Sequence, residues 1–166
     1  MSDKNLYEIV IDALPAGARH RRAWMSLVRC FSSIESILMR FFAQRYNSSL
    51  PRYDVLTALA MHPDGWTMGE LSELLMVSKG NVTGVIRRLE EDELVIKKTS
   101  SVDRRVQSVR ISAQGRRLWD KMHADYDAII STLMKGQSVS DLDVLVRVLD
   151  QAKDAVDSNA PKIDAD

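Results

Sequence analysis

The segment from Ser78 to Arg105 constrains the fold of this 166-residue chain more than any other part of its sequence. Ser78 can cap a helix, and the apolar residues after it recur at three- and four-residue steps along one side: Val82, Val85, Ile86 and Leu89. Two predicted strands follow, residues 94–99 and 106–111, and they enclose six residues rich in Ser and Arg. A polar helix beside a basic hairpin loop is typical of proteins that contact duplex DNA. The segment therefore predicts a DNA-binding region.

A second short helix is predicted directly before this one. Thr67 and Glu70 have the spacing of a capping box, and the helix that they begin has an apolar stripe at Leu71, Leu74 and Leu75. Residues 76–78 join the two helices, which gives a helix-turn-helix. Further upstream, Pro51 suits the first turn of another helix, and the turn signal at residues 62–65 ends it.

Longer helices are predicted on both sides of this region. Apolar residues recur on one side from about Ala18 to Tyr46, which indicates a helix of about 40 Å at ~1.5 Å per residue. Ser112 caps another helix, which Gly136 ends, and residues 138–157 form a last helix with a near-heptad seam. The predicted fold is mainly α-helical with a small β-wing.

Composition and charge are consistent with one compact domain. Apolar residues make up 45% of the chain and charged residues 28%, no apolar run approaches the ~20 residues of a membrane span, and no signal core begins the chain. The single cysteine, Cys30, cannot form an internal disulfide, and a cytoplasmic protein is expected. The net charge is zero, but the charges are unevenly distributed. Residues 79–117 contain ten Lys or Arg and five Asp or Glu, whereas residues 120–166 contain five Lys or Arg and ten Asp or Glu. This split predicts one basic face.

The order of these elements resembles the MarR family of bacterial transcriptional regulators. Three segments carry the resemblance: LPRYDVLTALA at 50–60, TMGELSELLMVSKGNVTGVIRRLEEDELV at 67–95 and DRRVQSVRISAQGR at 103–116. The resemblance implies an obligate homodimer with intertwined terminal helices, namely an N-terminal dimerisation region (1–50), a winged helix-turn-helix (51–111) and C-terminal dimerisation helices with a tail (112–166). One position departs from the family pattern, because Glu93 stands where glycine is common.

The candidate DNA-binding residues lie on the helix after Ser78 and in the wing. Ser78, Lys79 and Gly80 suit a phosphate or a base, and Asn81 can pair with adenine while the Thr83 methyl group touches thymine. Backbone phosphates are the expected partners of Arg87, Arg88, Lys97 and Arg104. By resemblance, Arg105 enters the minor groove and Asp103 supports the loop.

The resemblance also implies a small effector, which would bind between the long first helix and the helices around residues 53 and 123. Aromatic walls with arginines would suit an aromatic carboxylate or its coenzyme A thioester. Each candidate residue for this site could instead be a packing residue or part of a surface ion pair. The candidates are Trp24, Arg29, Phe31, Arg40, Arg52, Tyr53, His123 and Tyr126.

The expected function is a sequence-specific regulator, most often a repressor, which a small effector releases from a pseudo-palindromic operator. Two alternatives stay open: a redox-sensing repressor that acts through Cys30, and a dimer that packages DNA without sequence preference. Cys30 lies in an apolar helical run and is expected to be a buried packing residue. An enzyme and a metal or cofactor site are not expected, because catalytic motifs and metal-ligand spacings are absent from the sequence.

Overall fold

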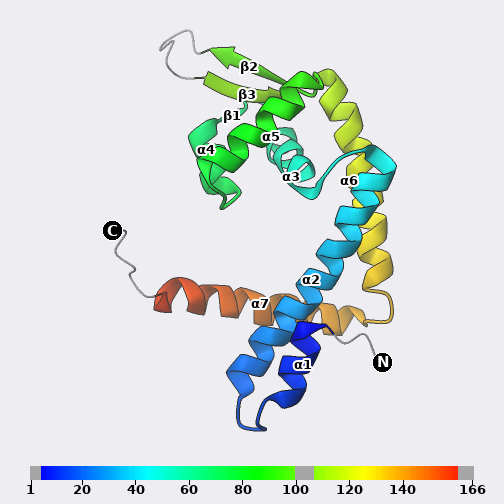
Figure 1. Ribbon diagram of the computed structural model, residues 1–166, viewed down its shortest axis with the longest axis vertical. Helices are drawn as coiled ribbons and strands as arrows, with labels where there is room; N and C mark the ends of the chain where they lie inside the picture. Colours follow the sequence, from blue (N-terminus) through cyan, green and yellow to red (C-terminus); the bar gives the residue numbers. More distant parts are fainter. Residues whose placement is uncertain (1–4, 100–106, 161–166) are drawn as a thin grey trace. The chain divides into compact units, whose positions relative to one another are not determined.

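The computed structural model describes residues 5–99 and 107–160 (Figure 1). The chain divides into two compact units, one up to Ile129 and one from Ile130 onward. Helix α6, Ala113–Leu133, runs through the boundary between them. Within the described ranges, no helix has both the length and the apolar character of a membrane span.

The first unit begins with two packed helices, α1 (Leu6–Ala13) and α2 (Arg19–Tyr46) (Figure 1). The long helix predicted from Ala18 to Tyr46 is confirmed as α2, whereas α1 was not predicted. A capping box between Asn5 and Glu8 begins α1. The guanidinium of Arg22 donates to the Leu14 carbonyl at 3.0 Å, which fixes the connection between the two helices.

Three helices form the predicted helix-turn-helix and its support: α3 (Leu50–Met61), α4 (Met68–Leu74) and α5 (Lys79–Glu91). The capping box at Thr67 is confirmed, because its hydroxyl accepts from the Glu70 amide at 3.3 Å and its own amide donates to the Glu70 carboxylate at 2.7 Å. Ser78 caps α5, as predicted, by accepting from the Asn81 amide at 3.3 Å. Both caps satisfy amides that a helix leaves unpaired at its start.

A three-stranded antiparallel sheet follows, in the order β1-β3-β2. Strands β2 (Val95–Thr99) and β3 (Gln107–Ile111) form the predicted hairpin, with Lys97 opposite Val109. The predicted second strand began at residue 106, which lies outside the described residues. Strand β1, Trp66–Thr67, was not predicted, and it pairs with β3 directly before α4.

The turn between α5 and β2 contains the residue that departs from the family pattern. Glu93 has φ +59°, the left-handed conformation that glycine adopts without strain. For a residue with a Cβ this conformation costs about 1 kcal/mol. The Leu94 amide donates to the Leu89 carbonyl at 2.8 Å and closes the turn. The chain therefore enters β2 through a left-handed residue, with a small conformational cost.

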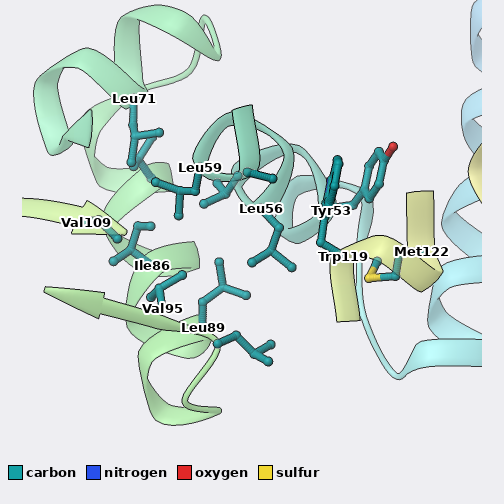
Figure 2. Packing of buried hydrophobic residues seen from close by; sticks show 14 of the residues in the cluster. Tyr53, Leu56, Leu59, Leu71, Ile86, Leu89, Val95, Val109, Trp119 and Met122 are labelled. Carbon is teal, nitrogen blue, oxygen red and sulfur yellow. The ribbon is translucent and has the colours of Figure 1, made fainter. Parts of the chain in front are cut away.

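The core lies where α3, α5 and the sheet meet, and Figure 2 shows its side chains converging from these elements and from α4 and α6. Leu56 and Leu59 of α3 and Leu89 of α5 are fully buried. Trp119 and Met122 of α6 belong to the same cluster and lie near Tyr53 (Figure 2). The core fixes the side of α5 that faces inward, so its opposite side is free for a partner.

Hydrogen bonds connect the first part of α6 to α2 and α3. The Trp119 indole donates to the Thr57 hydroxyl at 3.0 Å, and the Arg116 guanidinium donates to the Ala60 carbonyl at 3.0 Å. The Tyr46 hydroxyl donates to the Asp125 carboxylate at 2.6 Å. Ser112 begins α6, as predicted, by accepting from the Gly115 amide at 2.9 Å.

The second unit consists mainly of α7, Val139–Asn159, which a capping box at Ser138 begins. The predicted helix from residue 138 to residue 157 is confirmed and extends two residues further. None of its side chains is buried. Its exposed apolar residues are Val139, Val144, Leu145, Val146, Val148, Leu149 and Val156.

Candidate nucleic-acid interface

The first turns of α5 present the polar side chains that the sequence predicted. Lys79, Gly80, Asn81 and Thr83 are exposed. The residues on the other side of the same helix are buried: Val82, Ile86 and Leu89. A helix fixed along one side and polar along the other can approach the major groove without disturbing the core.

The Thr83 side chain has a defined orientation relative to its own helix. Its hydroxyl donates to the Lys79 carbonyl at 2.8 Å, so the hydroxyl proton is already engaged. The side chain retains its methyl group and the acceptor lone pairs of the hydroxyl for a partner. The methyl contact of Thr83 with thymine stays a prediction.

The predicted phosphate contacts differ in how their charges are placed. The Arg87 guanidinium lies 3.9 Å from the Glu91 carboxylate, and the Lys97 ammonium lies 2.5 Å from the Glu90 carboxylate. Arg88 is exposed, and no carboxylate in the described part of the chain forms an ion pair with it. To bind a DNA phosphate, Arg87 and Lys97 would each have to give up a carboxylate partner. Arg88 could bind a phosphate without losing an ion pair.

The predicted wing residues Asp103, Arg104 and Arg105 lie outside the described residues. The hairpin that leads to them is present, and Lys97 and Lys98 are exposed on β2. The minor-groove role of Arg105 and the support from Asp103 stay predictions.

Three of the predicted effector residues lie together, on α3 and α6. The Tyr53 and Tyr126 rings stack with their centroids 5.0 Å apart, and the Tyr53 hydroxyl lies 2.8 Å from His123 Nδ1. Trp119, which was not predicted, stacks on His123 at 4.7 Å. Burial is the main cause that raises the pKa of Tyr53 to about 12, so its hydroxyl stays protonated at neutral pH.

The spacing of α6 could have indicated this cluster. Trp119, His123 and Tyr126 lie at i, i+4 and i+7, which places them on one side of a helix. Leu118, the residue before Trp119, is only partly buried, whereas Trp119 is buried. The difference is one helical step, which sequence periodicity does not resolve well.

The other predicted effector residues have different surroundings. Trp24 and Phe31 are each 61% exposed on α2 and are not part of the core cluster. Arg29 and Arg40 lie on the same helix, and the Arg40 guanidinium donates to the Ser36 carbonyl at 3.4 Å. The guanidinium of Arg52 forms an ion pair with Asp92 at the C-terminus of α5. The structure therefore gives Arg52 a partner within the chain and does not join the α2 residues to the Tyr53 cluster.

The expectation of a buried Cys30 is wrong for the single chain, because Cys30 is exposed on α2. An apolar run predicted burial, but this part of α2 is covered on one side only, and the nearby Leu27 and Phe31 are also exposed. No group of three or more His, Cys, Asp or Glu side chains in the described ranges could hold a metal ion.

Asp54 of α3 has an unusual environment that the sequence did not indicate. Its side chain is exposed, yet the atoms around the carboxyl group desolvate it and raise its pKa to about 6, and the negative charge of Glu35 adds to this effect. No hydrogen bond or ion pair to the Asp54 carboxylate is present among the described residues. An unpartnered carboxylate lowers stability at neutral pH.

Replacing Asp54 with asparagine is therefore expected to increase the free energy of unfolding at about pH 7. The folded chain holds the Asp54 proton up to about pH 6, whereas an ordinary Asp releases it near 3.8. Folding then takes up a proton between these values, so the stability of the unsubstituted chain falls as the pH rises through this range. Solvent exposure keeps the effect modest. Urea denaturation at several pH values measures it, with Asp143→Asn on α7 as the control, and an unchanged pH dependence would refute it.

Comparisons with known proteins agree with this arrangement. Residues 48–106 match the model of the MarR family. BadR of Rhodopseudomonas palustris, a transcriptional activatory protein, is 32% identical over 95 residues, which cover 54% of this chain and 54% of BadR. The chain spans between half and two thirds of the length of the curated relatives that it matches.

Two solved structures share the fold over most of this chain. MepR of S. aureus, in a complex with DNA, is 18% identical with a TM-score of 0.70, and the match covers 78% of this chain and 96% of MepR. CouR of Rhodococcus jostii RHA1, bound to p-coumaroyl-CoA, is 20% identical with a TM-score of 0.69, and the match covers 91% of this chain and 100% of CouR. Residues 48–106 thus match the MarR family, and the chain shares its winged helix-turn-helix fold with MepR and CouR.

Proposed function

We propose that this protein binds duplex DNA as a homodimer and regulates transcription from a pseudo-palindromic operator in the cytoplasm. In this proposal, α5 of each protomer enters a major groove, and the wing places Arg105 in the adjacent minor groove. The two half-sites lie one helical turn apart, ~34–36 Å. The observation that carries the proposal is the polar first turns of α5, which are exposed while the opposite side of the helix is buried.

The dimer in this proposal would be formed by the helices outside the winged helix-turn-helix. Each unit has exposed apolar side chains: Trp24, Leu27 and Phe31 on α2 in the first unit, and a longer set on α7 in the second. Large apolar side chains at such density favour burial against another protein surface. A second copy of the chain is the partner that the family resemblance implies. Two copies would also provide the two recognition helices that a pseudo-palindrome requires.

In this proposal the protein is a repressor, and its effector, an aromatic carboxylate or the coenzyme A thioester of one, releases it from the operator. Tyr53, His123 and Tyr126 provide stacked rings and a hydroxyl beside a ring nitrogen. An effector carboxylate that reached Arg52 would compete with Asp92, which holds the end of α5. Such competition would connect ligand binding to the position of α5, through a difference in ligand affinity between two dimer states. The likeness to CouR with its bound p-coumaroyl-CoA is consistent with this class.

Replacing Asn81 with alanine is expected to weaken binding to the operator by roughly 5- to 150-fold, because a bidentate contact with adenine discriminates by about 1–3 kcal/mol. Fluorescence anisotropy on the DNA upstream of the gene, compared with a scrambled duplex, measures the effect. Gln44→Ala, which removes an exposed amide from α2, is the control. Equal losses on both duplexes would contradict base recognition by Asn81. An unsubstituted protein without any preference would indicate a DNA-packaging dimer instead.

The effector is tested by titrating aromatic acids and their coenzyme A thioesters into the protein–operator complex. We expect one of these compounds to increase the dissociation constant for the operator by roughly tenfold or more, within the usual range of allosteric coupling. Binding of such a compound to the free protein without any effect on DNA would contradict the proposed release. Release by peroxide, blocked by Cys30→Ser, would favour the redox alternative, for which the exposure of Cys30 is the relevant observation.

A further inference from the structure

Ser72 of α4 is buried, although its side chain is polar. Buried polar groups usually have a hydrogen-bond partner, and the partner of Ser72 lies outside its own helix. The Ser72 hydroxyl donates to the Val77 carbonyl at 2.7 Å, and the Val77 amide donates to the Ser72 carbonyl at 3.1 Å. Two hydrogen bonds in opposite directions therefore close the turn between α4 and α5.

The Ser72 hydroxyl bonds differently from other helical hydroxyls of this chain. A serine or threonine within a helix often donates to the carbonyl four residues earlier. Such bonds are formed here by Ser33, Thr57, Thr83 and Ser158. Ser72 instead donates to a residue five positions later, beyond the end of α4. Its hydrogen bond therefore connects α4 to the segment that leads into α5.

Met76, which lies within this turn, has a conformation that costs free energy. Its φ is +53°, in the left-handed region that is unfavourable for a residue with a Cβ. The Met76 side chain is 85% exposed, so packing of this side chain does not hold the conformation. Hydrogen bonds around it do: the Met76 amide donates to the Glu73 carbonyl at 3.1 Å, and the two bonds between Ser72 and Val77 enclose it. The Ser72 hydroxyl therefore offsets part of the cost at Met76.

The same turn leads directly into the first turn of α5. The peptide group between Val77 and Ser78 is planar, so a hydrogen bond that holds the Val77 carbonyl also fixes the direction of the Ser78 amide. The Ser78 hydroxyl in turn accepts from the Asn81 amide at 3.3 Å. Leu71, beside Ser72, is fully buried and anchors α4 in the core. A continuous set of contacts therefore runs from the core through Ser72 to the start of α5.

We propose that Ser72 is a positioning residue for DNA recognition, whose hydroxyl sets the direction in which α5 presents Asn81 to a base edge. This inference rests on the proposed function, in which Asn81 contacts adenine. A bidentate contact must meet a donor and an acceptor of the base together, so it is sensitive to a rotation of the helix. Phosphate contacts carry no sequence information. Loss of the Ser72 hydroxyl therefore weakens binding to the operator more than binding to a scrambled duplex.

Amide hydrogen exchange of the full-length protein, measured without DNA, tests the hydrogen bond itself. In Ser72→Ala we expect the Val77 and Asn81 amides to exchange roughly tenfold faster or more, while the Leu59 amide in the core keeps its rate. Ser33→Ala is the matched control, because it also removes a serine hydroxyl that donates to a carbonyl, on the exposed side of α2. This control should leave all three exchange rates unchanged.

Fluorescence anisotropy on the operator and on a scrambled duplex tests the consequence for recognition. We expect Ser72→Ala to weaken operator binding by roughly fivefold or more and to change binding to the scrambled duplex by less than about twofold. Met76→Gly, introduced into Ser72→Ala, should restore most of the operator affinity, because glycine adopts the left-handed conformation without cost. A role of Ser72 in stability alone would weaken binding to both duplexes together.

The inference is overturned if Ser72→Ala keeps the exchange rates or the operator affinity of the unsubstituted protein. It is also overturned if both duplexes lose affinity equally, or if Met76→Gly restores none of the loss. An unsubstituted protein that does not distinguish the operator from the scrambled duplex would refute the proposed function instead. The exchange rates, which are measured without DNA, would still decide whether Ser72 holds the turn.

Discussion

Replacing Phe42 with alanine is expected to lower the free energy of unfolding by roughly 3–5 kcal/mol. The Phe42 side chain on α2 is fully buried, and its ring lies 5.0 Å from the Tyr53 ring of α3 and 6.2 Å from the Tyr46 ring. Removing it leaves a cavity at the place where α2 packs on the winged helix. Urea denaturation followed by circular dichroism measures the loss.

Phe31→Ala is the matched control for this prediction, because Phe31 lies on the same helix and is 61% exposed. Its effect on unfolding at low protein concentration should be small. If the proposed dimer covers Phe31, the loss should appear only at concentrations where the dimer forms. Equal losses for both variants at every concentration would contradict the different roles of the two rings.

Alanine at position 115 is expected to lower the free energy of unfolding by roughly 3 kcal/mol. Gly115 is buried in the first turn of α6, and a Cβ built on it would lie 2.0 Å from the Leu94 carbonyl oxygen and 3.0 Å from an Ile111 side-chain atom. The nearest obstacle is backbone at the start of β2, so no side-chain rotation can relieve the overlap. The strand or the helix must move.

Gly84→Ala is the control for Gly115→Ala, because both positions lie in helices and only Gly115 is packed against other atoms. We expect Gly84→Ala to leave the stability unchanged or to increase it by up to about 1 kcal/mol. Thermal melts of the two variants measured together test the prediction. A Gly115→Ala variant as stable as the unsubstituted chain would show that α6 and β2 can separate without cost.

Most of the fold could be predicted from the sequence, because its helices begin with local signals. Thr67, Ser78 and Ser112 each cap a helix as predicted, with side chain and amide within four residues of each other. Ser138, where the last helix was predicted to begin, also caps its helix. Such contacts depend only on neighbouring residues, so the sequence contains them in full.

The missed elements have weaker or non-local signals. Strand β1 has two residues, and its partner in β3 lies about 40 residues further along the chain. No periodicity can appear in two residues. Helix α1 is short, although the Asn5 and Glu8 spacing was a readable capping box. Cys30 was predicted to be buried but is exposed in the single chain. An apolar run predicts that its residues are covered, but it does not tell whether the same chain or another chain covers them.

The candidate sites were predicted less completely than the fold. The polar face of α5 followed from its helical period, and Tyr53, His123 and Tyr126 proved to be close together. The partner of Arg52 could not be predicted, because Asp92 is 40 residues away and meets it only through the packing of α3 on α5.

Two ion pairs at α5 neutralise basic side chains within the chain itself. Glu90 and Glu91 already neutralise Lys97 and Arg87, so a polyanion that approaches this surface must displace carboxylates that are covalently part of the protein and cannot diffuse away. A polyanion that makes few contacts with this surface gains little binding free energy from displacing these carboxylates. A duplex that fits the whole surface can compensate for it, which favours selective over indiscriminate attraction.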